Sequence, residues 1–118
     1  MIITARIQLG TDAVSLLEYL RSQVTSPEQR YGTLKDKCRY VSIQMDASTG
    51  EPNSGAYIGN DNRVGFAGEF AGRVVDASSP VFELEDFAGG NIPLNFWLKQ
   101  RADAEAPRVL VTIIQDRD

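Results

Sequence analysis

The sequence predicts a mainly β protein: an antiparallel β-sandwich or jelly-roll-like module of about seven or eight short strands with one N-terminal α-helix. Three observations predict this class. Apolar and polar residues alternate with period two near both ends of the chain, in residues 2–9 and 108–115. Turn-forming residues recur roughly every 8–12 residues from Lys37 onward, which is the spacing of small sandwiches. Clear helical spacing occurs once, in residues 12–24.

The N-terminal part, residues 1–36, is expected to hold a strand, the helix and a loop or arm. The strand is expected over residues 2–9, because Ile3, Ala5, Ile7 and Leu9 fall on one side of an extended chain. Residues 25–36 are polar and include a proline and a glycine, so we expect a loop there.

The helix is expected over residues 12–24, with Thr11 as its N-cap. Pro27 should end it, because a proline disfavours the helical conformation of the residue before it. Its apolar residues are expected to be Ala13, Leu17, Leu20 and Val24, joined by Val14 and Leu16.

Residues 37–118 are expected to form the sandwich core, so that residues 1–118 make a single domain. Strands are expected at residues 37–45, 56–58, 73–75, 81–85, 94–98 and 108–115. The last of these has apolar residues on both faces, which predicts a central position in a sheet. Trp97, the only tryptophan, is expected in the core beside Phe96, and Phe82 and Leu84 are also expected there.

Composition excludes several classes of function. The chain of 118 residues has no histidine and one cysteine, Cys38, so Ser-His-Asp and Cys-His catalysis and an internal disulfide are excluded. It carries 12 Lys and Arg against 16 Asp and Glu, a net charge of −4, which argues against binding nucleic acid. No apolar run approaches the ~20 residues that span a bilayer, and the first residues do not resemble a signal peptide. We therefore expect no enzymatic activity, no cofactor and no membrane partner, and synthesis in a reducing cytoplasm.

Several residues could bind a ligand or take part in catalysis, or could have a structural role only. Glu83 and Glu85, followed by Asp86, could bind Ca²⁺ or act as acid and base. Residues 46–51 and 59–62 suggest calcium loops, but the spacing of an EF-hand is not met. We interpret these groups as solvated strand positions and turns, and Cys38 as a small buried hydrophobe. Six large rings could form a carbohydrate-stacking surface, but in a small sandwich most are core: Phe66, Phe70, Phe82, Phe87, Phe96 and Trp97.

The candidate site is a basic stripe. Lys35, Lys37 and Arg39 occur at alternate positions, so an extended chain would place them along one face, with Arg30 upstream. Residues 83–118 carry seven acidic against four basic residues. A contact between subunits, head to tail, would bring these opposite charges together. The structural alternative is a solvated face.

From Tyr40 onward the chain resembles a family of small virion proteins of tailed bacteriophages. The resemblance lies in residues 40–44, 56–64, 81–85, 91–98 and 108–114, and covers about two-thirds of the chain. Those proteins are β-sandwich modules of capsids or tail-associated complexes. The resemblance implies a capsid decoration or cement-like subunit, located in the virion and assembled in the host cytoplasm. Its implied partners are copies of itself and the major capsid protein or other virion proteins, as a homo-oligomer.

Two alternatives remain open at this stage. A neck, tail or baseplate component would belong to the same structural class. A small ligand- or carbohydrate-binding β-module would belong to a different one.

Overall fold

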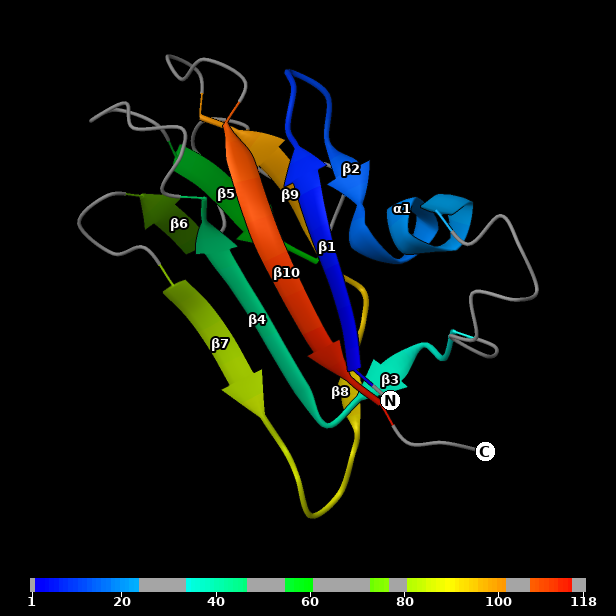
Figure 1. The fold of residues 1–118 in the computed structure, drawn as a ribbon. Helices are drawn as coiled ribbons and strands as arrows, with labels where there is room; N and C mark the ends of the chain where they lie inside the picture. The colour runs from blue at the N-terminus through cyan, green and yellow to red at the C-terminus, as the bar shows by residue number, and fades with distance from the viewer. Residues whose placement is uncertain are drawn as a thin grey trace.

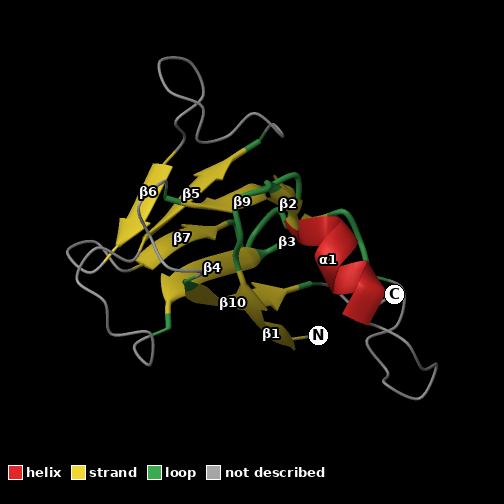
Figure 2. Cartoon of the chain, turned by 90° about the horizontal axis from the view of Figure 1, so that it is seen from above, coloured by secondary structure: helices red, strands yellow, loops and turns green. Residues whose placement is uncertain are grey.

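The computed structural model describes residues 2–23, 34–46, 55–60, 73–76, 81–101 and 107–115. In these residues two four-stranded antiparallel sheets face one another, with a small two-stranded sheet and one helix at the periphery. Figure 2, which views the chain from above, shows the two layers with the helix beside one margin. The predicted mainly β, antiparallel sandwich with one N-terminal helix is confirmed.

The first sheet has the strand order β1–β10–β4–β7 (Figure 1). Its strands are β1 (Ile2–Gln8), β10 (Arg108–Ile114), β4 (Tyr40–Met45) and β7 (Val81–Glu85). The predicted central position of the last strand is confirmed, because β10 pairs with β1 on one side and β4 on the other. The register aligns the inward residues Ala5, Val111 and Ile43 across three strands.

The second sheet has the order β2–β9–β5–β6. Its strands are β2 (Val14–Ser15), β9 (Trp97–Gln100), β5 (Gly55–Gly59) and β6 (Arg73–Asp76). Two further short strands, β3 (Lys37–Cys38) and β8 (Ile92–Pro93), pair with one another. The expected strand from Lys37 is therefore divided at Arg39, so that its first two residues leave the main sheets.

The helix α1 spans Leu16–Gln23, which is shorter than predicted. Residues 14 and 15 are not helical because they pair with Leu98 and Trp97 of β9. The N-cap is consequently Ser15, whose Oγ accepts the Glu18 N–H at 3.4 Å, and not Thr11. The predicted residues Val24 and Pro27 lie outside the described part of the chain.

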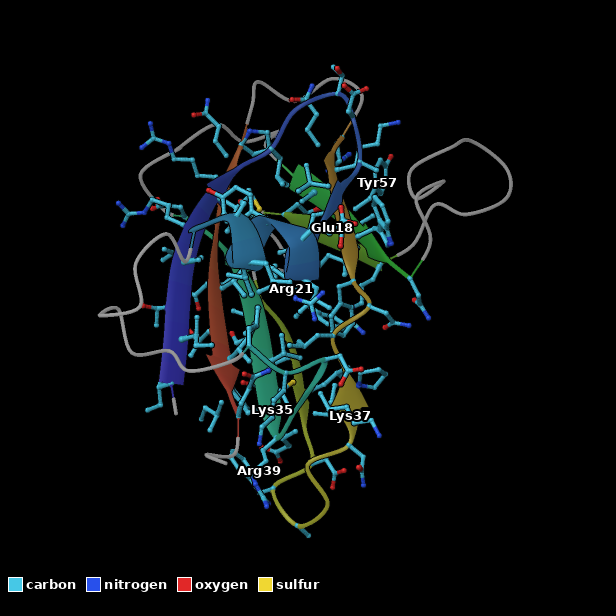
Figure 3. The ribbon with its side chains drawn as sticks, turned by 90° about the vertical axis from the view of Figure 1, so that its right-hand side faces the viewer. Glu18, Arg21, Lys35, Lys37, Arg39 and Tyr57 are labelled. Atoms are coloured by element: carbon cyan, nitrogen blue, oxygen red, sulfur yellow. The ribbon has the colours of Figure 1, made fainter. Side chains whose placement is uncertain are left out.

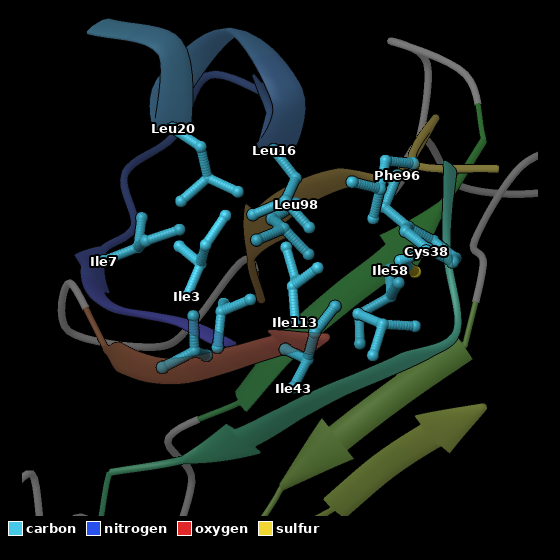
Figure 4. Packing of buried hydrophobic residues seen from close by; sticks show 14 of the residues in the cluster. Ile3, Ile7, Leu16, Leu20, Cys38, Ile43, Ile58, Phe96, Leu98 and Ile113 are labelled. Carbon is cyan, nitrogen blue, oxygen red and sulfur yellow. The ribbon is translucent and has the colours of Figure 1, made fainter. Parts of the chain in front are cut away.

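The buried face of α1 is formed by two of the predicted apolar residues, Leu16 and Leu20. Figure 4 shows Leu20 pointing toward Ile3 and Ile7 of β1 and Leu16 toward Leu98 of β9, and Leu17 is only partly buried. Residues 16 and 20 are four apart, which places them on one face of the helix. Packing on the sandwich margin, rather than intrinsic propensity, sustains so short a helix.

The core contains Phe96, and the prediction for Trp97 is wrong. Phe96 is buried and meets the Phe82 ring edge-on, with centroids 5.8 Å apart. Leu98 is fully buried, so the alternation along β9 directs Trp97 to the outer face, where it is half-buried. Leu84, also expected in the core, is 41% exposed because β7 is an edge strand with no described strand beyond it.

In the described residues, no helix is long and apolar enough to cross a membrane.

Candidate functional site

The predicted basic residues gather at one end of the sandwich. Figure 3 shows Lys35, Lys37 and Arg39 at the same end of the molecule, with Tyr57 toward the other. Lys37 is exposed, whereas Lys35 and Arg39 are half-buried. We call the surface formed by these three residues the basic end. Arg30, the fourth predicted residue, lies outside the described residues.

The basic end is anchored by Gln115, which follows β10 and is buried. Its amide nitrogen donates to the carbonyl oxygens of Lys35 (2.7 Å) and Lys37 (3.0 Å). Its amide oxygen accepts the N–H of Lys35 at 3.3 Å. The Gln115 side chain thus supplies the hydrogen bonds that a neighbouring strand would otherwise give to the N–H and C=O groups of this segment. Without them these main-chain groups would lack this hydrogen-bond partner in the protein.

Main-chain bonds fix the rest of the segment. Lys37 and Cys38 pair with Pro93 and Ile92, and the Leu94 N–H donates to the Asp36 carbonyl at 2.8 Å. Leu34 is buried at the start of the segment. The basic side chains therefore extend from a backbone that is held in place from residue 34 onward. Residues 25–33 of the predicted loop or arm lie outside the described part of the chain.

Arg39 bonds to the main chain of the segment that follows β7 in its own chain. Its guanidinium NH1 donates to the Phe87 carbonyl, and its own carbonyl accepts the Asp86 N–H at 2.7 Å. Tyr40 stacks on Phe87 with ring centroids 5.9 Å apart. The fold thus places part of the acidic C-terminal third beside Arg39 without a second subunit. Of the three basic residues, Lys37 is the most exposed and so the most accessible to a partner.

Two carboxylates of this stretch, Glu83 and Asp86, have structural roles in this fold. Asp86 accepts the N–H groups of Gly89 (3.1 Å) and Asn91 (3.2 Å), which closes the turn after β7. Glu83 accepts the Tyr40 hydroxyl at 2.6 Å, and this hydrogen bond is the main cause that raises the pKa of Tyr40. No group of three or more potential ligands that could hold a metal ion occurs in the described ranges. The remaining calcium candidates, residues 47–51 and 61–62, fall outside those ranges.

Asp46, the first residue of one candidate calcium loop, is engaged elsewhere. It is buried, and its Oδ2 lies 3.0 Å from Nε of Arg6 on β1. The pair spans the outer face of β10, so it links the two strands that flank the centre of the first sheet. Sequence reasoning missed this pair because nothing local connects residue 6 to residue 46.

Cys38 lies beneath the basic end. The side chain is buried, and this burial raises the pKa of the thiol from 9.0 to about 11. The group is therefore protonated at neutral pH and a poor nucleophile, despite its basic neighbours in sequence. The interpretation of Cys38 as a buried hydrophobe is confirmed.

Comparison with known proteins found no match among protein-family models, curated proteins or solved structures.

Proposed function

We propose that the protein is a non-enzymatic structural subunit of a virion, a capsid decoration or cement subunit that binds the shell as a homo-oligomer. The observation that carries this proposal is the presentation of Lys35 and Lys37 on a backbone held by the buried Gln115. A contact surface that is ordered before binding loses less conformational entropy when a partner docks. The resemblance of residues 40–114 to small tailed-phage virion proteins supplies the viral context.

The partner of the basic end is an acidic protein surface. Rim lysines of this kind steer encounter and set register, while apolar contacts supply most of the affinity. Many identical copies on a shell also make a weak individual contact sufficient. A second copy of the chain offers exposed carboxylates on Glu83 and Glu85, and the shell protein is the other candidate.

A neck, tail or baseplate component would use the same chemistry at a different place in the particle. The two roles differ in copy number and in neighbours. Quantitative mass spectrometry of the particle separates them, because a decoration subunit is present in numbers comparable to the shell protein and a neck or baseplate subunit in few copies.

A ligand-binding module is the second candidate, and one observation favours it. Tyr57 of β5 and Trp97 of β9 lie on the outer face of the second sheet. Tyr57 is paired with Lys99, and Trp97 lies two residues before Lys99 on the same strand, so the two rings are diagonal neighbours. Neighbouring rings on a flat face are the arrangement on which sugars stack. Titration of the Trp97 fluorescence with a panel of mono- and oligosaccharides tests this function, and an unchanged spectrum would exclude it.

The structural proposal is tested by charge reversal at the basic end. Lys37→Glu should weaken assembly and reduce its salt dependence, while the monomer stays folded, because the side chain is exposed. Arg108→Glu is the matched control, since Arg108 is also exposed and begins β10, whose other end leads to Gln115. Sedimentation velocity at low and high salt measures the outcome. Equal assembly of the parent and both variants would overturn the basic end as a contact surface.

A further inference from the structure

The outer edge of β7 is a strand edge to which no described strand pairs. β7 bonds to β4 on one side only. Next to this pairing, the Asp86 N–H donates to the carbonyl of Arg39, which precedes β4. This bond shows that even-numbered residues of β7 point their main-chain N–H and C=O groups toward β4. Leu84 and Phe82 therefore direct their main-chain groups toward β4, and Val81, Glu83 and Glu85 direct theirs outward.

The opposite edge of the same sheet, formed by β1, is in contact with the helix. The Leu9 N–H donates to the Pro107 carbonyl, so odd-numbered residues of β1 bond toward β10 and even-numbered ones face outward. The outward carbonyl of Arg6 accepts the Tyr19 hydroxyl of α1 at 3.5 Å. The helix thus lies against part of the β1 edge, while the β7 edge lies at the other margin of the sandwich, away from α1 (Figures 1 and 2).

Exposed apolar side chains are concentrated on this stretch. Val81 is 43% exposed, Leu84 41% and Phe87 51%, and they account for three of the five large hydrophobic residues that are exposed in the described ranges. Glu83 and Glu85 stand between them and are exposed as well. An edge of this kind offers both a row of hydrogen-bonding groups and apolar contacts, with a negative charge at alternate positions.

We propose that the β7 edge accepts an additional strand from a partner polypeptide, an extended segment with Lys or Arg at alternate positions and apolar residues between them. Charge complementarity selects this occupant. The outward face of the added strand lies opposite Glu83 and Glu85, where basic side chains form ion pairs. A second β7 would place its own glutamates there, and like charges directly opposite one another are destabilising. This contact uses Glu83 and Glu85, which a second copy would also offer to the basic end. The two proposals are nevertheless tested separately, because peptide binding at residues 81–87 reports on the β7 edge and salt-dependent assembly of Lys37→Glu reports on the basic end.

A synthetic peptide tests the proposal. The probe is a seven-residue peptide, Thr-Lys-Val-Lys-Val-Lys-Thr with blocked ends, and its counterpart replaces each lysine with glutamate. Added at millimolar concentration to the ¹⁵N-labelled protein, the lysine peptide should shift the amide signals of residues 81–87 and slow hydrogen exchange at Val81, Glu83 and Glu85. The glutamate peptide should leave these signals in place. Glu83→Lys combined with Glu85→Lys should reverse the preference between the two peptides.

A second pair of variants separates strand addition from simple charge attraction. Glu85→Pro removes an outward N–H that bonds to no described strand, a position at which an edge strand tolerates proline. Glu85→Ala removes the same carboxylate but keeps the N–H. Glu85→Pro should bind the lysine peptide about tenfold more weakly than Glu85→Ala. Lys37→Glu should bind it as the parent does. Equal binding by Glu85→Pro and Glu85→Ala, equal shifts from both peptides, or no shift at residues 81–87 would overturn the proposal and leave the glutamates as guards against aggregation.

Discussion

The side-chain amide of Gln115 binds both the N–H and the C=O of Lys35, eighty residues earlier in the chain. A third bond, to the Lys37 carbonyl, completes the contact. One buried side chain thus joins the end of the central strand to the segment that carries the basic residues. The candidate contact surface and the first sheet are therefore parts of one folded unit.

Replacing Gln115 should destabilise the protein more than an exposed glutamine does. Gln115→Leu removes three part-buried hydrogen bonds and leaves main-chain groups of Lys35 and Lys37 without these partners, so the free energy of unfolding should fall by about 2–4 kcal/mol. Gln8→Leu, on an exposed position of β1, is the control and should change it by less than about 0.5 kcal/mol. Urea denaturation measures both. Similar values for the two variants would show that the anchor contributes nothing to stability.

Phe96 should matter more to stability than Trp97, although tryptophan is the larger residue. Phe96 is buried against Phe82, so Phe96→Ala should cost about 3–5 kcal/mol. Trp97 is half-buried on the outer face and leaves a smaller void when truncated. Chemical denaturation of the two alanine variants compares them directly. A larger loss of unfolding free energy for Trp97→Ala than for Phe96→Ala would contradict the orientation of β9.

Period-two alternation predicted the strands well. The inward residues Val109, Val111 and Ile113 of β10 are all buried, as are Val41 and Ile43 of β4. The same parity extends to Gln115, so the pattern already contained a signal that this glutamine points inward. The predicted strand included Gln115, but its inward orientation was not predicted, because a polar side chain carries no hydropathy signal and its partners are distant in sequence.

The errors lie where tertiary contacts override a local pattern. Residues 14 and 15 have helical spacing with the leucines that follow, but pairing with β9 makes them a strand. Leu84 alternates like a core residue, yet among the described strands its own strand has a neighbour on one side only. The basic residues alternate as predicted, but the segment bends into β3, and Arg39 bonds to its own chain. None of these contacts is local in sequence.

The turn after β7 should depend on Gly90. Its φ of 65° is in the left-handed region, where a residue with a Cβ is strained. Gly90→Ala should lower the free energy of unfolding by about 1–2 kcal/mol. Gly10→Ala is the matched control, because a Cβ there meets nothing within 4 Å, and it should be neutral or slightly stabilising. Thermal melts of both variants decide the matter, and equal midpoints would rule out a special role for the turn.

Chelation should leave the fold unaffected. Asp86 uses its carboxylate on the N–H groups of Gly89 and Asn91, and Glu83 is bonded to Tyr40, so neither needs a cation to be satisfied. Prolonged treatment with EDTA should not change the thermal midpoint. A fall of several degrees that Ca²⁺ restores would instead show a bound ion, because a ligand of the native state adds stability in proportion to its occupancy.

Alkaline pH should destabilise the protein through Cys38. Burial raises the pKa of its thiol from 9.0 to about 11 in the folded state, so the native protein holds this proton more tightly than the unfolded chain. The contribution is fully present below pH 9 and is lost progressively as the pH rises to 11. Tyr40 acts in the same direction above its ordinary pKa of 10.0, because its hydroxyl proton is bound to Glu83.

Two variants separate these contributions. Cys38→Ala should lose stability less steeply between pH 9 and pH 11 than the parent, whereas at pH 7 it carries only the cost of the smaller side chain. Tyr40→Phe should change the slope mainly above pH 10. Urea unfolding at several pH values gives the slopes, and the difference between variants removes the effect of all other titrating groups.

The native thiol should also react slowly with a disulfide reagent at pH 8 and rapidly after unfolding. A rapid reaction of the native protein, or parallel slopes for the parent and Cys38→Ala, would show that the thiol is accessible and not held protonated by burial.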